Sequence, residues 1–458
     1  MVSHYSRRSV LMTAGLVLKL FVIVLVGGGA ASGQQASTAE AISAERLAGN
    51  YQLPNRTVIG IDSFAGGSGP PVPLFTDYTT GIIRTLFPLG GDRFVMGPGF
   101  GVQSPVERTV RVVRDTAGAV IGIGLQRSGE DEVVASRLPS TVREITFTNE
   151  DATLAGTLIT PPTPGPHPAI VLLHGSGPLT RHSFGPYPRF FASLGLAVLI
   201  YDKRGAGAST GTFFPRTAFY PEPYLRDAVA AVKFLKARDD INGGQIGLWG
   251  TSEGGMLTTQ VAAVENVAFA INSSGFMMPL WEQVLYNIEA QLSADGFAAT
   301  EVADAVRFET MALEVMRTGS RWDEYEGAQA AALQTKWWSA YFGSSKGFSS
   351  LEGIRWQWEH IYRFDPLPAL RTVTCPVLGL FGALDTSTPA QQTARNMENV
   401  LRAAGHRDVT IKIFEQANHP LMDARTGGNA EIPTLARMAP GVFDTIRVWL
   451  SSRITPAP

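Results

Sequence analysis

Residues 245–264, QIGLWGTSEGGMLTTQVAAV, decide the fold of this chain. An apolar run precedes the turn GTSEGG, and a segment of helical character follows it. Gly250 and Gly254 flank Ser252 and leave room for a serine in a strained backbone conformation. The pattern predicts a strand, a sharp turn and a helix, with the Ser252 hydroxyl at the helix N-terminus, where the helix dipole favours negative charge. Ser252 is therefore the candidate nucleophile.

Short apolar runs alternate with helical segments on both sides of this stretch. The apolar runs include AIVLLHG (169–175), AVLIYD (197–202), PVLGLFG (376–382) and VTIKIFE (409–415). Strands buried on both faces have this composition, and the helices between them are the crossovers of a parallel sheet. Two further strands are expected at 142–148 and 152–160, around the turn NED. The sequence predicts an α/β fold with a doubly wound, mostly parallel sheet.

Two regions differ from this alternating pattern. Residues 34–140 contain short β-branched runs separated by Gly, Pro and Asp turns, which predict a separate small antiparallel β domain with a structural or substrate-positioning role. Residues 276–367 are helical in character and predict a cap inserted between strands, over the sheet edge where such folds bind ligands. The cap contains six of the eight tryptophans, namely Trp281, Trp322, Trp337, Trp338, Trp356 and Trp358. Aromatic residues of this kind usually pack a domain onto itself, although here they also suggest an apolar or aromatic substrate group.

The N-terminus has the order of a secretory signal peptide. Arg7 and Arg8 precede an apolar run, and small residues follow, with Ala31 and Gly33 at the −3 and −1 positions of a cleavage site. The paired arginines resemble a twin-arginine export signal. We expect a periplasmic or secreted protein, with an uncleaved membrane anchor as the alternative. Lys19 argues against the anchor, because a charge near the centre of a membrane span is costly.

These patterns divide the chain into five segments. They are a signal peptide at 1–33, the β domain at 34–140, the first part of the α/β core at 141–275, the helical cap at 276–367 and the second part of the core at 368–458. No stable membrane span is expected after removal of the signal peptide.

The composition excludes several classes of function. Hydrophobic residues make up 45% of the chain, charged residues 17%, and the net charge is −2, so nothing indicates nucleic-acid binding. Cys375 is the only cysteine, which excludes a disulfide framework and a thiolate zinc site, and it is expected to be buried and inert. No metal-binding spacing stands out, so we expect no metal and no cofactor.

A serine needs a base and a group that orients the base. In the hydrolase order of nucleophile, acid and histidine, Asp385 follows the run PVLGLFG and His419 follows the next run, VTIKIFE. Each should leave the carboxyl end of its strand, at the edge where Ser252 emerges. We therefore predict a catalytic triad of Ser252, Asp385 and His419.

From Val142 to the C-terminus the chain resembles α/β-hydrolases of the serine aminopeptidase, dienelactone hydrolase and acyl-peptidase branch. The resemblance rests on motifs in matching order, namely HGSGP (174–178), YDKRGAGAST (201–210), GTSEGG (250–255), GALDTSTP (382–389) and ANHPL (417–421). It implies an oxyanion hole made by the backbone N–H groups of Ser176 and Glu253. Glu253 replaces the aromatic residue that peptidases of the prolyl oligopeptidase kind carry there, which disfavours a peptidase. The Glu253 carboxylate is expected to cap the helix at the surface.

Other polar residues are assigned no chemistry. Asp202 and Arg204 are expected to pair with each other, and Arg181 is expected on the solvated rim, where it could also bind a substrate carboxylate. His182 and His360 lack the spacing of a triad residue, so they are interpreted as structural or exposed.

The sequence thus predicts an exported serine hydrolase that cleaves carboxylic esters through an acyl-enzyme, with a small-molecule ester or acyl substrate. One alternative is an aminopeptidase or amidase with the same triad, for which Asp323 to Glu326 (DEYE) could bind a free amine. A second alternative is a non-catalytic binding protein on a hydrolase fold.

Overall fold

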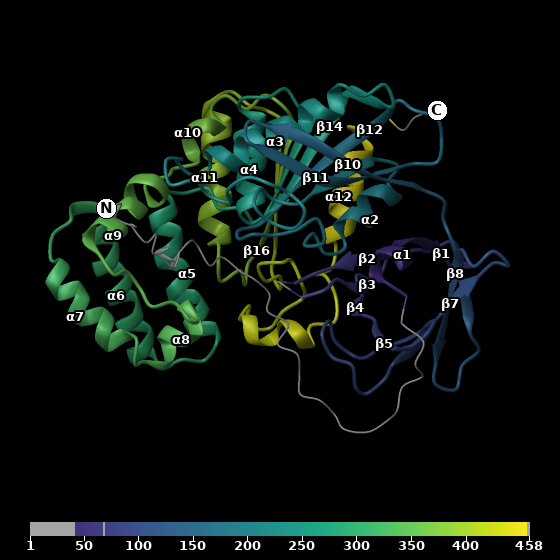
Figure 1. Ribbon diagram of the computed structural model, residues 1–458, viewed down its shortest axis with the longest axis horizontal. Coiled ribbons are helices and arrows are strands. Elements are labelled where there is room, and N and C mark those ends of the chain that lie inside the picture. The colour runs from purple at the N-terminus through teal and green to yellow at the C-terminus, as the bar shows by residue number, and fades with distance from the viewer. Residues whose placement is uncertain (1–41, 67–68, 456–458) are drawn as a thin grey trace, which may run out of the picture.

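The structure is a computed structural model that describes residues 42–66 and 69–455 (Figure 1). The predicted signal peptide at 1–33 lies outside the described residues. The described chain forms two sheets, one antiparallel and one mixed, and a group of helices at one side.

The first sheet belongs to the predicted N-terminal β domain. Its strands are β1 (Gly49–Gln52), β2 (Val58–Phe64), β3 (Val72–Asp77), β4 (Ile83–Thr85), β5 (Phe87–Gly90), β6 (Arg93–Met96), β7 (Arg108–Arg114), β8 (Val120–Arg127) and β9 (Val133–Arg137). Their order is β4-β3-β2-β1-β9-β8-β7-β6-β5, and every pairing is antiparallel. The short helix α1 (Ala44–Leu47) precedes β1. Alternating apolar residues such as Ile59, Ile61 and Ile123 fill the core of this domain.

The second sheet has the predicted doubly wound topology. Its strands are β10 (Thr141–Asn149), β11 (Ala152–Thr160), β12 (His167–Leu173), β13 (Ala197–Tyr201), β14 (Ile241–Thr251), β15 (Phe269–Ser273), β16 (Val377–Gly382) and β17 (Val409–Phe414). The order is β10-β11-β13-β12-β14-β15-β16-β17, with antiparallel pairing of β10 with β11 and of β11 with β13, and parallel pairing beyond. The predicted fold class is confirmed.

Helices cover both faces of this sheet (Figure 1). One layer contains α2 (Tyr187–Ser193) and α12 (Val442–Ser451), and the other contains α3 (Glu222–Lys236), α4 (Glu253–Ala262) and α11 (Ala390–Ala403). Successive side chains of a strand point to opposite faces, so Ile170 and Leu172 pack with the first layer, while Val171 and Leu173 pack with the second. This burial on both faces explains the continuous apolar runs.

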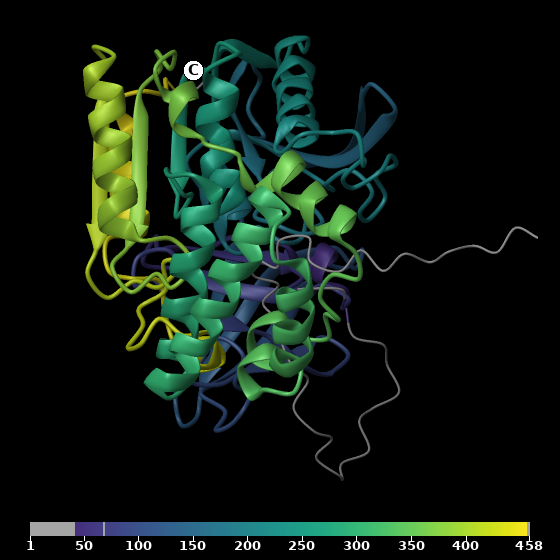
Figure 2. The ribbon, with the colours of Figure 1, turned by 90° about the vertical axis from the view of Figure 1, so that its left-hand side faces the viewer.

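The segment between β15 and β16 is helical, as predicted. It contains α5 (Leu280–Ala294), α6 (Ala299–Thr318), α7 (Trp322–Ala332), α8 (Lys336–Phe342), α9 (Leu351–Gln357), the π-helical turn η1 (Trp358–Tyr362) and α10 (Leu367–Leu370). Figure 2, in which this helical insertion faces the viewer, shows its two long helices α5 and α6 side by side. Trp337 and Trp338 are buried within the insertion.

The β domain is joined to the α/β core by backbone hydrogen bonds. The Phe100 N–H donates to the Leu435 carbonyl at 2.7 Å, and the Ala65 N–H donates to the His182 carbonyl at 2.8 Å. Residues 428–439, which include the 3-10 helix η2 (Asn429–Thr434), therefore run against the β domain, as the yellow segment beside β4 shows in Figure 1. These bonds fix the β domain against the edge of the sheet where the candidate residues lie.

Candidate active site

Ser252 has the strained geometry of a nucleophile elbow. It lies between β14 and α4 with φ 57° and ψ −123°, a region that side-chain-bearing residues rarely adopt. A Cβ on Gly250 would overlap the Gly254 carbonyl, and a Cβ on Gly254 would overlap the Leu173 carbonyl, so both positions require glycine. The Ser252 N–H donates to the Ser273 carbonyl at 2.9 Å, which holds the turn against β15. Strain of this kind costs about 1–3 kcal/mol and is retained at functional sites.

The predicted acid and base are in contact. His419 Nδ1 lies 2.9 Å from Oδ1 and 2.8 Å from Oδ2 of Asp385, and both side chains are almost fully buried. A carboxylate oxygen only accepts, so His419 Nδ1 carries the proton and donates a hydrogen bond to Asp385. Asp385 Oδ1 also accepts from the backbone N–H groups of Ser387 at 2.7 Å and Thr388 at 2.8 Å. These bonds fix the orientation of the carboxylate toward His419.

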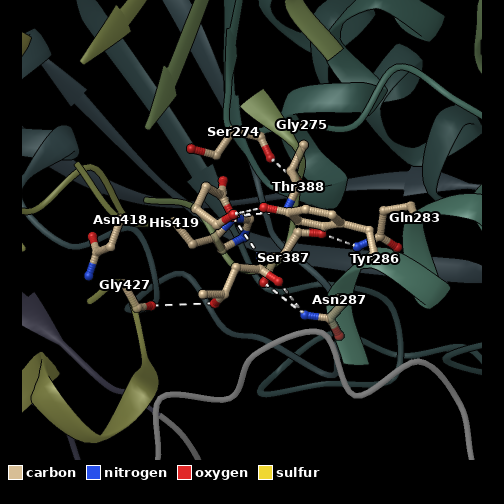
Figure 3. A network of polar contacts seen from close by, with 12 residues as sticks. Ser274, Gly275, Gln283, Tyr286, Asn287, Ser387, Thr388, Asn418, His419 and Gly427 are labelled. Carbon is tan, nitrogen blue, oxygen red and sulfur yellow. Dashed lines mark hydrogen bonds and ion pairs between the residues drawn. The ribbon is translucent and has the colours of Figure 1, made fainter. Parts of the chain in front are cut away.

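Side chains of the helical insertion form hydrogen bonds with the loop that carries Asp385 (Figure 3). From α5, the Tyr286 hydroxyl donates to the Asp385 carbonyl at 2.6 Å, and Asn287 Nδ2 donates to the Thr386 carbonyl at 3.0 Å. Gln283 Nε2, one turn earlier, donates to the Ser387 carbonyl at 2.5 Å. Three side chains on one face of α5 thus hold three consecutive carbonyls of the loop.

His419 lies in a tight turn after β17, beside Asn418 in Figure 3. The Leu421 N–H donates to the Asn418 carbonyl at 3.0 Å, and the Met422 N–H donates to Asn418 Oδ1 at 2.9 Å. Leu421 has φ 61°, so this turn is also strained. A Cβ on Gly382 would overlap the Ala417 carbonyl, which shows how closely the turn packs against the end of β16.

Ser252 and His419 line the same cavity, which has a volume of about 140 Å³. Gly175, Ser176, Trp249 and Tyr187 form part of its wall. The β domain supplies a further apolar wall made by Phe64, Leu74, Ile83 and Phe100. Among the described residues, none from the helical insertion lines this cavity. The expectation that the aromatic insertion shapes the substrate site is therefore wrong for this cavity, because the β domain occupies that position.

Both predicted oxyanion donors lie beside Ser252. Ser176 lines the cavity just beyond the end of β12, and a Cβ on Gly175 would lie 3.6 Å from Ser252 Cβ. Glu253 is the first residue of α4, where backbone N–H groups have no partner inside the helix. Within residues 42–66 and 69–455, neither the Ser176 nor the Glu253 N–H donates to another group of the chain. Their roles, like those of the triad, stay predictions that this geometry permits.

The Glu253 side chain differs from its predicted surface position. It is buried and forms an ion pair with Lys203, which is buried as well. The expected pair of Asp202 with Arg204 is also wrong. Arg204 binds Asp227 instead, with two contacts of 2.7 Å. Consecutive residues leaving β13 point in different directions, so sequence adjacency does not decide the partner.

Arg181 is buried rather than placed on a solvated rim. Its guanidinium contacts Asp202 at 3.0–3.1 Å and also pairs with Glu144, so it is already occupied by carboxylates of the chain. Asp323 and Glu324 lie exposed on α7 and do not line the cavity. The proposed amine-binding cluster DEYE is therefore not at the site.

Three further histidines, His174, His182 and His360, and the cysteine have structural surroundings. His360 stacks on Phe219 and Trp356, with Nδ1 2.8 Å from the Ala218 carbonyl. His182 is partly buried, and its backbone carbonyl accepts a hydrogen bond from the Ala65 N–H. Cys375 is buried, and burial raises the pKa of its thiol to about 12. Burial, together with nearby Lys203, lowers the pKa of His174 to about 3, so this ring is neutral.

Two kinds of feature are absent from the part of the chain that the structure describes. No group of three or more His, Cys, Asp or Glu residues there could hold a metal ion. None of the helices in residues 42–66 and 69–455 is long and apolar enough to cross a membrane.

Comparison with known proteins identifies relatives across most of the chain. The sequence model of the alpha/beta hydrolase family matches residues 170–428. Esterase EstD of Thermotoga maritima is 27% identical over 358 residues, which cover 75% of this chain and 76% of EstD. The quorum-quenching protein AidA of Acinetobacter baumannii is 30% identical over 138 residues, which cover 30% of this chain and 45% of AidA.

Solved structures with a similar fold include esterase Pf2001 of Pyrococcus furiosus. The two share 15% sequence identity with a TM-score of 0.43, and the match covers 69% of this chain and 92% of the esterase. An acylaminoacyl peptidase matches 90% of this chain and 56% of its own length, with 16% identity and a TM-score of 0.45.

Proposed function

Because this chain belongs to the alpha/beta hydrolase family and is a hydrolase with esterase relatives, we propose that it cleaves carboxylic esters with Ser252 as nucleophile. The observation that carries the proposal is the strained Ser252 turn in the same cavity as His419, whose Nδ1 contacts Asp385. A nucleophile, a base and a group that orients the base are the parts that acyl transfer needs.

The geometry supports a two-step reaction. In the first step Ser252 Oγ attacks the ester carbonyl while His419 Nε2 takes the hydroxyl proton, and this proton then passes to the departing alkoxide. The products of this step are an acyl-serine ester and a free alcohol. In the second step His419 activates water, which attacks the acyl-serine, releases the carboxylic acid and restores the hydroxyl. Asp385 keeps Nδ1 protonated and stabilises the imidazolium that forms in both steps.

The negative charge of each tetrahedral intermediate falls between the N–H groups of Ser176 and Glu253. The Glu253 N–H lies at the N-terminus of α4, where the helix dipole adds to the two hydrogen bonds and further stabilises an oxyanion. Each such donor is worth about 2.7–4 kcal/mol in the transition state.

The cavity favours an ester with a compact apolar group. In its described lining the ionisable side chains are the imidazole of His419 and the phenol of Tyr187. This lining contains no carboxylate. An apolar cavity of about 150 Å³ accepts benzene, so the space of about 140 Å³ suits a phenyl ring or a short alkyl chain. An aminopeptidase would need a carboxylate to bind the free amine of its substrate, so this lining makes the aminopeptidase alternative weaker.

Labelling with a fluorophosphonate probe tests the nucleophile directly. Wild type should react, whereas Ser252→Ala and His419→Ala should not, and both should lose ester hydrolysis by several orders of magnitude. Ser274→Ala provides a matched control, because Ser274 is also a buried serine with positive φ but does not line the cavity. Probe labelling that persists in folded Ser252→Ala would overturn the assignment. Folded wild type that neither reacts with the probe nor hydrolyses esters would favour the binding-protein alternative.

A substrate panel then tests the ester preference. We expect hydrolysis of p-nitrophenyl esters with short acyl chains or an aromatic acyl group, and little hydrolysis of aminoacyl p-nitroanilides. The reverse preference would favour the aminopeptidase.

We also propose that the protein is exported, from the order of charged, apolar and small residues in positions 7–33. Cell fractionation, with N-terminal sequencing of the exported protein, tests both export and cleavage after Gly33. Replacing Arg7 and Arg8 by Lys should block export if the signal is of the twin-arginine type.

A further inference from the structure

Lys203 is a buried lysine whose ammonium has two polar partners and two aromatic neighbours beside the site. Its Nζ donates to the Gly175 carbonyl at 3.0 Å and forms an ion pair with the Glu253 carboxylate. The rings of Tyr224 and Phe213 enclose the ammonium, at 4.3 Å and 5.5 Å from Nζ to the ring centres. Cation–π contacts of this type hold a desolvated ammonium in place.

The carbonyl that Lys203 binds belongs to the peptide group between Gly175 and Ser176. The N–H of that same peptide group is the first proposed oxyanion donor. A cation on the oxygen of a peptide withdraws electron density from its nitrogen, so the N–H becomes a stronger donor. The bond also fixes the plane of the peptide, and hence the direction in which the Ser176 N–H points.

The second partner of Lys203 is the side chain of the other donor residue. Glu253 directly follows the nucleophile, and its own N–H is the second proposed oxyanion donor. Glu253 Oε2 lies 3.4 Å from the Ser176 hydroxyl, which donates to it. One buried ion pair therefore connects the loop after β12 with the first turn of α4, and each of these segments carries one donor.

We propose that the pair Lys203–Glu253 positions and polarises the oxyanion hole. Lys203 and Glu253 act here as positioning residues through their side chains, and neither residue is part of the described lining of the cavity that contains Ser252 and His419. This inference rests on the proposed function, since an oxyanion hole has meaning only if Ser252 performs acyl transfer.

The expected effect is specific to the transition state. Loss of one whole oxyanion donor lowers kcat by about 100- to 1000-fold, so a misaligned and unpolarised donor should lower kcat by roughly 10- to 100-fold. The ground-state ester carbonyl interacts weakly with the hole, and KM should therefore change little.

The main test compares Lys203→Met, Glu253→Gln and the double variant that carries both changes. Each single variant leaves one buried charge without its partner and can lose stability for that reason. The double variant replaces both charged side chains by uncharged ones of similar shape. It therefore leaves no buried charge without a partner. A merely structural pair predicts that the double variant recovers the wild-type kcat, whereas the positioning role predicts that kcat stays low.

The double variant of the neighbouring pair, Arg204→Met with Asp227→Asn, is the matched control. This pair is equally buried and starts at the next residue of the chain, but it contacts neither Gly175 nor Glu253. We expect it to lower the melting temperature without changing kcat.

Inhibition by a trifluoromethyl ketone gives a second readout, because the inhibitor forms a tetrahedral oxyanion with an active serine. Its Ki should rise for the Lys203 variants by the factor by which kcat/KM falls. An unchanged kcat and Ki in the folded double variant would overturn the positioning role. If Ser252→Ala keeps full activity, the proposed function fails instead, so the two failures are distinguishable.

Discussion

The β domain and the helical insertion lie on opposite sides of the same sheet edge, and they act on the candidate site in different ways. The β domain contributes side chains to the cavity wall, with Phe64 and Phe100 near Ser252. The insertion contributes none, but its helix α5 binds the loop of Asp385 through Tyr286 and Asn287. One region therefore lines the cavity of the candidate site, and the other binds the loop that carries Asp385.

Under the proposed function, this difference separates substrate selectivity from catalytic rate. A change in the β domain alters the shape available to an acyl or alcohol group, so its effect depends on the ester. A change in α5 alters the position of Asp385, which in the proposed mechanism serves every substrate alike. The comparison predicts that substitutions in the two regions give kinetically distinct variants.

Among these variants, the largest loss of kcat is expected from Asp385→Asn. Asp385 is the residue whose loop the insertion holds in place. An amide at this position donates toward His419 Nδ1 and stabilises the wrong tautomer of the ring. We expect kcat to fall by about 10⁴-fold at neutral pH for all esters, measured by initial rates with fluorophosphonate titration of active sites. A loss of about tenfold or less would show that Asp385 does not orient His419 and that the support from α5 serves only stability.

The second prediction concerns the wall from the β domain. Phe100→Ala should enlarge the cavity and change the preference between short and long acyl chains by about 10- to 100-fold in kcat/KM, in favour of longer chains. Phe348→Ala is the matched control, since it removes the same buried ring from the insertion. It should lower stability and leave the order of substrates unchanged. Equal effects of the two variants on acyl preference would contradict the division between the regions.

The third prediction concerns the support of the acid. Tyr286→Phe removes the hydroxyl that donates to the Asp385 carbonyl and should lower kcat by roughly 2- to 10-fold, by the same factor for each ester. Tyr325→Phe removes a hydroxyl of the insertion that bonds only within it, to Gln329 at 2.7 Å, and should leave kcat unchanged. If Tyr286→Phe instead reorders the substrates, α5 takes part in binding them.

Glu309→Gln in α6 is expected to leave kcat unchanged and to alter only the stability of the protein. Burial raises the pKa of Glu309 from 4.5 to about 7. The folded state therefore retains a proton that the unfolded state has lost, and stability declines as the pH rises from about 4.5 to about 7. The Gln variant lacks this penalty. The melting temperatures of the two proteins should agree near pH 4.5, and that of the Gln variant should be higher above pH 7. The corresponding gain in the free energy of unfolding above pH 7 should be roughly 1–3 kcal/mol.

Thermal melts at several pH values, with kcat measured in parallel, check this prediction. A pH-independent difference between the two proteins would show that Glu309 does not titrate in that range. A change in kcat would mean that the interior of the insertion, and not only the face of α5, controls the site.

Much of the candidate site could be predicted because its signals are local. The glycines around Ser252 reflect overlaps with nearby carbonyls, which no larger residue could avoid. Asp385 and His419 each follow an apolar strand, and the carboxyl ends of parallel strands meet at one edge. Their contact of 2.8 Å agrees with that topology, while their catalytic roles await the tests above.

The charged partners could not be predicted in the same way. Asp202, Lys203 and Arg204 are consecutive, yet they bind Arg181, Glu253 and Asp227 respectively. Each partner lies at least 21 residues away, and the direction of each side chain depends on how β13 ends against its neighbours. A run of charges in the sequence contains no information about these directions.

The sequence by itself determined the sheet, the elbow and the order of the candidate triad, because strand burial, glycine sterics and strand ends follow from local residue patterns. Only the tertiary structure decided that the β domain, rather than the tryptophan-rich insertion, adds side chains of its own to the wall of the cavity, and that Lys203 reaches both proposed donor segments. The physical reason is that docking between domains and burial of an ion pair depend on complementary surfaces far apart in the chain, which no single segment specifies.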